Sequence, residues 1–237
     1  MKENLTELVF ILDRSGSMGG LEDDTIGGFN STLDTHKAEE GEAVVSTVLF
    51  DHETKVLHDR VPIQKVEHIT RNDYQVRGST ALLDAVGSSI RHIERVHSYL
   101  PEEYRPARTI FVITTDGYEN SSHKYTYGAI KETIERKRKE DWEFLFLGAN
   151  IDAVKEAERI GIHQDRAVTY MADSQGQRLA YESVNGALSE MRCSKKMSAV
   201  SGAWKAAVEA DTAARGSKPD KHTSDQGSKL HKLFSRK

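Results

Sequence analysis

The sequence predicts an α/β protein whose core is a doubly wound, mostly parallel sheet of six strands, with one antiparallel edge strand and helices on both faces. Apolar runs that are too continuous for a strand with one face in water alternate along the chain with longer segments of helical spacing. The length of 237 residues and the hydrophobic fraction of 37% are sufficient for one such domain with a buried core.

The strands are expected where the apolar runs are longest. The three most apolar runs should form the centre of the sheet, and they are residues 7–13 (ELVFILD), 108–116 (RTIFVITTD) and 142–150 (WEFLFLGAN). Residues 43–50 and 55–63 flank the segment DHET, which is too short for a crossover helix, so this pair should be an antiparallel hairpin. Residues 168–172 are expected to be the last strand.

Between these runs, apolar residues recur three or four positions apart, which is the spacing of an amphipathic helix. Helices are therefore expected at residues 26–36, 81–100, 127–140, 154–160 and 177–192. We assign residues 1–211 to one domain that includes a C-terminal helical extension from about residue 175.

The C-terminal segment 212–237 differs in composition from the rest of the chain. It contains seven Lys or Arg and two Asp, a net charge of +5, whereas the whole chain carries −4 and residues 1–211 therefore carry −9. The segment has few apolar residues and is predicted to be a disordered basic tail. Its basic end offers a contact for nucleic acid or an acidic partner, but a solvated tail is the commoner outcome. Nucleic-acid binding is not expected, because acids interrupt the basic run ERKRKED at residues 135–141.

Cysteine content and hydropathy bear on the cellular setting. Cys193 is the only cysteine, so neither an internal disulfide nor a thiolate zinc site can form. The N-terminal apolar stretch ends at Asp13 and has neither a signal-peptide cleavage region nor the length of a membrane span. These features predict a cytoplasmic protein that does not enter the membrane.

Candidate functional residues gather where two central strands end. Asp13 closes one strand and Asp116 another, and ligands of open α/β sheets bind outside the carboxyl ends of the strands. After Asp13 the chain reads DRSGS, and the two-residue period of an extended chain places Asp13, Ser15 and Ser17 on one side. Such a cluster of hard oxygens suits Mg²⁺ or Mn²⁺, whereas zinc prefers nitrogen and sulfur.

A third segment brings further polar groups towards the same edge. Thr80, in GSTALLDA, starts a predicted helix after a glycine loop, and Asp84 lies one helical turn later on the same face. Asp84 is either a group that orients a water or hydroxyl at the site or a plain surface carboxylate. Glu119 and Asn120, in DGYENSS, are close to Asp116 in sequence, but a loop or a helix cap explains them equally well.

Taken singly, DRSGS is explained by a capped turn and Thr80 by a helix cap, but in combination the segments are more specific. Together they resemble the metal-ion-dependent adhesion site (MIDAS) of von Willebrand factor A (vWA) domains, and the matching residues are Asp13, Ser15, Ser17, Thr80 and Asp116. The resemblance covers about residues 5–175 and implies the strand order 3-2-1-4-5-6. One departure is Ser79, where glycine is commoner in the family.

The resemblance implies how these residues act. Ser15, Ser17 and Thr80 would bind the metal largely directly, and the two aspartates would often act through water. A partner protein would supply the last ligand from an Asp or Glu. Stand-alone domains of this kind in bacteria and phages often act as adaptors, beside AAA+ ATPases or within tellurite-resistance and stress operons. We therefore expect a metal-dependent protein-binding module and not an enzyme.

A magnesium-dependent hydrolase is the principal alternative. Phosphatases with an Asp-x-Asp nucleophile and acid also bind Mg²⁺ at the carboxyl end of a doubly wound sheet, but here Ser15 replaces the second aspartate. The sequence also contains no GxxxxGK[ST] nucleotide-binding loop and no HExxH zinc motif. The sequence therefore favours binding over hydrolysis.

Overall fold

The computed structural model describes residues 1–194 and 201–216, and its sheet confirms the predicted fold class. The order of the strands is β3-β2-β1-β4-β5-β6, and every neighbouring pair except β2 and β3 is parallel. The strands are β1 (Lys2–Asp13), β2 (Glu42–Phe50), β3 (Thr54–Pro62), β4 (Pro106–Thr115), β5 (Trp142–Ala149) and β6 (Ala167–Tyr170).

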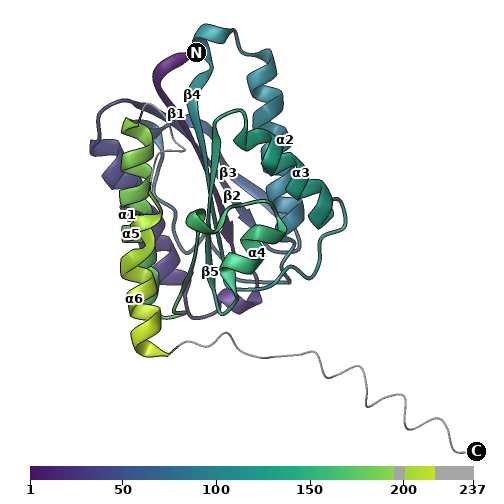
Figure 1. Cartoon of the computed structure of the whole chain (residues 1–237), viewed down its shortest axis with the longest axis vertical. Coiled ribbons are helices and arrows are strands. Elements are labelled where there is room, and N and C mark those ends of the chain that lie inside the picture. Colours follow the sequence, from purple (N-terminus) through teal and green to yellow (C-terminus); the bar gives the residue numbers. More distant parts are fainter. Residues whose placement is uncertain (195–200, 217–237) are drawn as a thin grey trace, which may run out of the picture.

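Helices cover both faces of this sheet (Figure 1). They are α1 (Glu22–Ala38), α2 (Leu82–Tyr99), α3 (Tyr127–Arg138), α4 (Ala153–Arg159), α5 (Ser174–Cys193) and α6 (Ala206–Arg215). Helices α2, α3 and α4 lie on one face, and α1 and α5 lie on the other with α6 beside α5. Among the described residues, no helix is both long and apolar enough to cross a membrane.

The central strand β1 shows why its sequence is almost continuously apolar. Leu8, Phe10 and Leu12 belong to the core between the sheet and α1 and α5, whereas Val9 and Ile11 belong to the core beneath α2 and α3. Because successive side chains of a strand point to opposite faces, a strand covered on both faces needs apolar residues at every position.

Helix α1 begins earlier than its apolar spacing predicts. Its first turn is formed by Glu22, Asp23 and Asp24, which interrupt the apolar pattern. Acidic side chains are favourable at this position because the N-terminus of a helix carries partial positive charge. The sequence pattern found the buried part of the helix and missed its exposed first turn.

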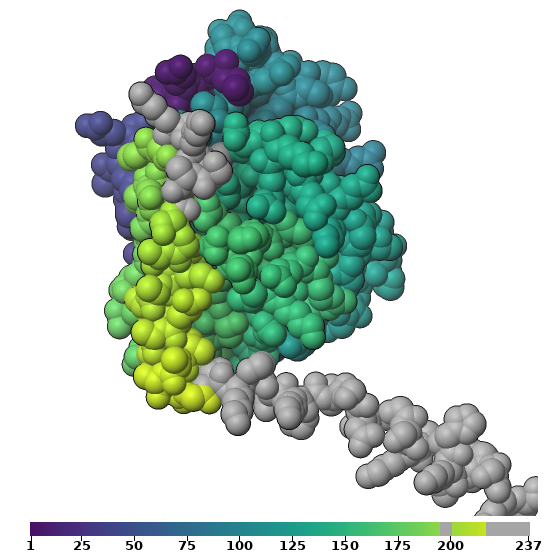
Figure 2. Space-filling view, viewed as in Figure 1, coloured from purple at the N-terminus to yellow at the C-terminus, as the bar shows by residue number. Residues whose placement is uncertain are grey.

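The predicted domain boundary at residue 211 falls inside α6, which continues to Arg215. Thr212 donates a hydrogen bond from Oγ1 to the carbonyl of Thr169 at 3.1 Å, and Lys205 donates from Nζ to the carbonyl of Ala167 at 3.1 Å. Both carbonyls belong to β6, so this segment covers one edge of the sheet, and Figure 2 shows α6 in yellow along that side. The tail predicted to be disordered was residues 212–237, and this prediction is wrong for residues 212–215, which are helical, while residues 217–237 lie outside the described residues.

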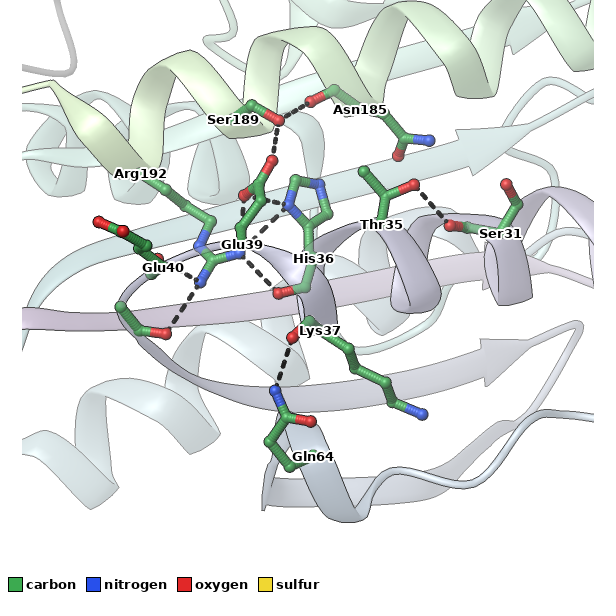
Figure 3. A network of polar contacts seen from close by, with 11 residues as sticks. Ser31, Thr35, His36, Lys37, Glu39, Glu40, Gln64, Asn185, Ser189 and Arg192 are labelled. Atoms are coloured by element: carbon green, nitrogen blue, oxygen red, sulfur yellow. Dashed lines mark hydrogen bonds and ion pairs between the residues drawn. The ribbon is translucent and has the colours of Figure 1, made fainter.

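The C-terminal end of α5 is held by a polar network at the turn after α1 (Figure 3). The guanidinium of Arg192 donates from Nη1 to the carboxylate of Glu39 at 2.8 Å and to the carbonyl of His36 at 3.0 Å. Ser189, one turn earlier on α5, donates to the same carboxylate. The predicted helical extension is therefore packed on the domain, through charged groups as well as apolar ones.

Candidate metal centre

Two neighbouring parallel strands bring the predicted aspartates to one edge of the sheet. Strand β1 ends at Asp13, and β4 ends at Thr115, immediately before Asp116. Beyond Asp13 the chain stays extended at Ser15 and then turns through the 3₁₀ segment Gly16–Met18. This local path places the two serines next to the strand ends.

The predicted hydroxyl groups and Asp116 form one continuous chain of contacts. Oγ1 of Thr80 donates to Oγ of Ser15 at 3.0 Å, and Oγ of Ser15 lies 3.1 Å from Oγ of Ser17. Oγ of Ser17 donates to Oδ1 of Asp116 at 2.6 Å. A side chain at Gly117 would crowd these contacts, because a Cβ atom there would lie 3.1 Å from Oγ of Ser17. Three loops that are distant in sequence thus meet at one point.

Asp13 is fully buried and joins the cluster through the backbone. Its Oδ1 accepts the N–H of Ser15 at 2.7 Å, and its Oδ2 accepts the hydroxyl of Thr115 at 2.6 Å. Burial raises the pKa of Asp13, although these hydrogen bonds oppose the shift. The side chain is held firmly on both sides, so it is part of the framework of the site.

Asp116 is less completely bonded. Its Oδ2 is buried and has no hydrogen-bond partner among the described residues, and the residue is only 3% exposed. Burial, with a smaller contribution from the charge of Asp13, raises the pKa of Asp116 to about 6. In the described part of the chain, no Lys, Arg or His forms an ion pair with either aspartate.

The groups present fit a hard divalent cation. Two carboxylates and three hydroxyls face one another, every ligand atom is oxygen, and one carboxylate oxygen still has bonding capacity. Mg²⁺ and Mn²⁺ favour such oxygen ligands and retain waters in part of their coordination shell. The residues that would hold the ion are Asp13, Ser15, Ser17, Thr80 and Asp116.

Two residues that the sequence left open hold Thr80 in place. Asn120 accepts the N–H of Thr80 through Oδ1 at 2.9 Å and returns its own N–H to the carbonyl of Thr80 at 3.0 Å. Glu119 accepts the N–H of Leu83 through Oε2 at 2.9 Å, so it caps the start of α2. Thr80 is therefore not the cap of this helix, and its hydroxyl is directed to Ser15 instead.

Asp84 lies in the first turn of α2, and its carboxylate contacts the loop after β4. Its carboxylate accepts the backbone N–H groups of His123, Lys124 and Tyr125 at 3.0, 2.8 and 3.0 Å. None of the hydrogen bonds described for Asp84 reaches a candidate ligand. Asp84 thus anchors the loop after β4 to α2, and its effect on the site is exerted through that loop.

The sequence was also compared with known proteins. No protein-family profile and no curated protein sequence matches the chain. Solved structures with a similar fold include proximal thread matrix protein 1 from the mussel byssus (TM-score 0.53, 16% identity), with 78% of this chain and 46% of that chain covered. A further structure of that protein, described as having a zinc-occupied MIDAS motif, gives a TM-score of 0.52 at 17% identity, with coverage of 78% and 46%.

A bacterial structure extends this comparison. The von Willebrand factor type A structure from Catenulispora acidiphila has a TM-score of 0.50 at 15% identity, with 78% of this chain and 42% of that chain covered. The chain therefore has the fold of vWA domains, with the strand order that its sequence predicted. It spans less than half the length of these matched structures.

Proposed function

We propose that this chain is a metal-dependent protein-binding module that holds Mg²⁺ or Mn²⁺ at the strand-end site and presents it to an Asp or Glu of a partner protein. The hydroxyls of Ser15, Ser17 and Thr80 would face the cation directly. Asp13 and Asp116 would balance its charge from the strand ends. When bound, the cation supplies an open coordination position for a carboxylate from the partner.

The unpartnered Oδ2 of Asp116 is the observation that carries this proposal. A buried carboxylate that has neither a cation nor a full set of hydrogen bonds is unfavourable, and the raised pKa of Asp116 reflects this. A bound cation would remove that penalty. Because the hydroxyl ligands are neutral, they leave much of the cation's charge uncompensated, and it retains attraction for an incoming carboxylate.

The wider role that we propose is that of a cytoplasmic bacterial or phage adaptor, with a partner such as an AAA+ ATPase or another protein encoded in the same operon. The fold supports an adaptor because the candidate site lies at one edge of the sheet, where Ser17 is exposed although the other four candidate ligands are buried. The solved zinc-occupied MIDAS motif of proximal thread matrix protein 1 supports a cation site on this fold. Membrane contact has no part in the proposal.

A hydrolase is less well supported by the same residues. The position that an Asp-x-Asp phosphatase would use for its general acid is held by Ser15, whose hydroxyl bonds to Thr80 and Ser17. We therefore propose a site that binds without catalysis. Metal-dependent hydrolysis of aryl phosphates or nucleotides that is lost in Asp116→Asn would contradict this.

The described residues also give little support for nucleic-acid binding. In the basic run on α3, Arg136 and Lys137 each lie 2.8 Å from the carboxylate of Glu94, and Arg138 donates to the carbonyl of Gly161 at 3.1 Å. These cations are engaged within the domain, so they do not form a free basic surface.

Direct titration tests the metal part of the proposal. Mg²⁺ and Mn²⁺ should bind the full chain by isothermal titration calorimetry, and Ser17→Ala and Asp116→Asn should weaken binding. Ser98→Ala is the matched control, because Ser98 is an exposed serine whose hydroxyl bonds only locally, to the carbonyl of Arg95. Equal affinities in Ser17→Ala, Asp116→Asn and Ser98→Ala would contradict the site.

Capture experiments test the partner. A bacterial lysate should yield a protein that binds the immobilised chain in Mg²⁺ and is released by chelator. The same protein should not bind Asp116→Asn but should bind Ser98→Ala. A partner that binds all three proteins with and without metal would show that recognition uses another surface.

A further inference from the structure

A third aspartate lies at the same edge of the sheet. Asp51 follows β2 directly, just as Asp13 closes β1 and Asp116 follows β4, and β2, β1 and β4 are neighbours. Asp51 is fully buried, but unlike the other two it has cationic partners. Its Oδ2 accepts a hydrogen bond from Nε of Arg77 at 2.9 Å, and it forms an ion pair with Nε of Arg14 at 2.9 Å, although that nitrogen makes no hydrogen bond to a described residue.

The two arginines come from the two loops that carry the candidate hydroxyl ligands. Arg14 stands between Asp13 and Ser15, and the alternation of an extended chain turns its side chain away from theirs. The Arg14 side chain is only 7% exposed, so Asp51 is the counter-ion of a buried cation. Arg77 precedes Thr80 in the second loop and is half exposed.

Backbone contacts join the same two loops. The N–H of Arg77 donates to the carbonyl of Arg14 at 2.9 Å, and the N–H of Gly16 donates to the carbonyl of Gly78 at 3.0 Å. Both glycines lack a Cβ that would crowd this contact: a Cβ at Gly16 would lie 3.2 Å from the carbonyl of Gly78, and Gly78 itself has a φ of +68°. Loop 14–17 and loop 77–80 therefore form one unit that rests on Asp51.

We propose that Asp51 is a positioning residue for the metal centre, which holds Arg14 and Arg77 and thereby sets the approach of Ser15 to Thr80. The inference rests on the proposed function, because the spacing of the two hydroxyls affects metal binding only if both are metal ligands. The 3.0 Å contact between Oγ1 of Thr80 and Oγ of Ser15 is the only described side-chain bond between these two loops at the ligand positions. The other described contacts that set their separation are the backbone bonds between the loops, the ion pairs of Asp51, and the bonds of Thr80 and Ser17 to the loop after β4.

The two guanidinium groups pair with Asp51 and not with the candidate ligands. Oδ2 of Asp51 lies beside Arg14 and Arg77, and among the described residues neither arginine forms an ion pair with Asp13 or Asp116. Arg14, Asp51 and Arg77, here called the clamp, therefore connect the two loops without adding a competing ligand.

The segment Asp51–Glu53 is not itself a second metal site. Asp51, His52 and Glu53 have ligand atoms close together, but Oδ2 of Asp51 is taken by the two arginines and its Oδ1 accepts the N–H of Glu53 at 2.7 Å. Glu53 in turn bonds Nη2 of Arg77 at 2.8 Å. The cluster is satisfied by cations of the protein, in contrast to Asp116.

The test compares Asp51→Asn with two controls in the full chain. Glu53→Gln removes the exposed acid that bonds Arg77 but keeps the contact between Asp51 and Arg14. Glu7→Gln removes a fully buried carboxylate elsewhere on β1, so it controls for destabilisation alone. Each protein is titrated with Mn²⁺ and followed by electron paramagnetic resonance, and amide exchange is measured by NMR in chelator.

We expect Asp51→Asn to weaken Mn²⁺ binding by about tenfold or more, as loss of groups that orient metal ligands does. Both controls should bind Mn²⁺ as the wild type does. In chelator, the amides of Gly16 and Arg77 should exchange faster in Asp51→Asn than in Glu7→Gln. Wild-type Mn²⁺ affinity in Asp51→Asn, or an equal loss in Glu7→Gln, would overturn the assignment.

Two outcomes separate this inference from the proposed function. If the wild type binds no Mn²⁺, the metal proposal fails, and exchange of the Gly16 and Arg77 amides still decides whether Asp51 orders the loops. If Asp51→Asn does not fold, Arg77→Gln replaces it, because Arg77 is half exposed and its loss is tolerable for folding. Arg77→Gln should weaken Mn²⁺ binding while Arg77→Lys restores part of it, and wild-type affinity in Arg77→Gln would overturn the clamp.

Discussion

Strand β1 carries two fully buried carboxylates, Glu7 and Asp13, that have different partners. Glu7 lies between two basic side chains, with Oε1 2.7 Å from Nε of Arg60 and Oε2 2.7 Å from Nε2 of His97. Asp13 bonds to a backbone N–H and a hydroxyl, and among the described residues it has no basic partner. The protein thus supplies its own cations to Glu7, whereas the proposed function gives Asp13 an external one.

The largest expected effect comes from removing the internally balanced carboxylate. Glu7→Gln leaves Arg60 and His97 without their counter-charge in a mostly buried place, where their side chains are 18% and 14% exposed. The free energy of unfolding should fall by about 3 kcal/mol, as it does when one member of a buried ion pair is removed. Urea denaturation with chelator and with Mg²⁺ should give the same loss, and a loss that Mg²⁺ cancels would refute the comparison.

Adding metal should have the next largest effect, and only through the strand-end site. A ligand that binds only the folded protein at a hundred times its Kd stabilises it by about 2.7 kcal/mol. Mg²⁺ or Mn²⁺ should therefore raise the melting temperature of the wild type and of Glu7→Gln but not that of Asp116→Asn. Equal shifts in all three proteins would mean that the metal acts elsewhere.

The pH dependence of stability should reveal the raised pKa of Asp116 when no metal is added. The pKa of Asp116 is raised from 3.8 to about 6 in the folded protein, so folding favours its protonated form. Its contribution to stability is complete below the unfolded pKa and is lost as the pH rises to about 6. In chelator, wild-type stability should fall over this window relative to Asp116→Asn, as followed by urea denaturation at several pH values. A wild-type curve parallel to that of the variant would contradict the raised pKa.

The smallest effect is expected from removal of the tail. Truncation after Gly216 keeps α6 and deletes a segment with six Lys or Arg and two Asp, and the melting temperature in chelator should stay nearly unchanged. If truncation lowers the melting temperature of the wild type but not that of Asp116→Asn, the conclusion changes. A basic side chain of the tail would then balance the strand-end aspartates in place of a metal.

The fold was predictable because the central strands are buried on both faces and their apolar runs are unbroken, as in Phe10 and its neighbours on β1. The proximity of Asp13 and Asp116 was predictable because the ends of neighbouring parallel strands share one edge of the sheet, whereas the complete set with Thr80 came from the resemblance to the MIDAS. Helix α6 was missed because it buries little beyond Val208 and its sequence is rich in alanine. Little apolar periodicity remains in such a helix.

The clamp at Asp51 was harder to foresee. Its position after an apolar run matches those of Asp13 and Asp116, so the sequence contained a signal for a strand-end aspartate. Its pairing with Arg77 depends on the orientation of the Arg77 side chain, which is set by the tertiary packing of the loop. Asp84 illustrates the same limit, since its helix position was predictable but its bonds to the loop 123–125 were not.

The cover over β6 has a consequence for how copies of the chain can associate. Lys205 and Thr212 occupy the carbonyls of Ala167 and Thr169, so a strand from another molecule cannot pair with those atoms. Among the described residues, β3 is the other edge strand of the sheet, where pairing with a second molecule can still occur. Two copies that join through a single shared edge form a closed pair related by two-fold symmetry, and growth stops there instead of continuing into a fibre.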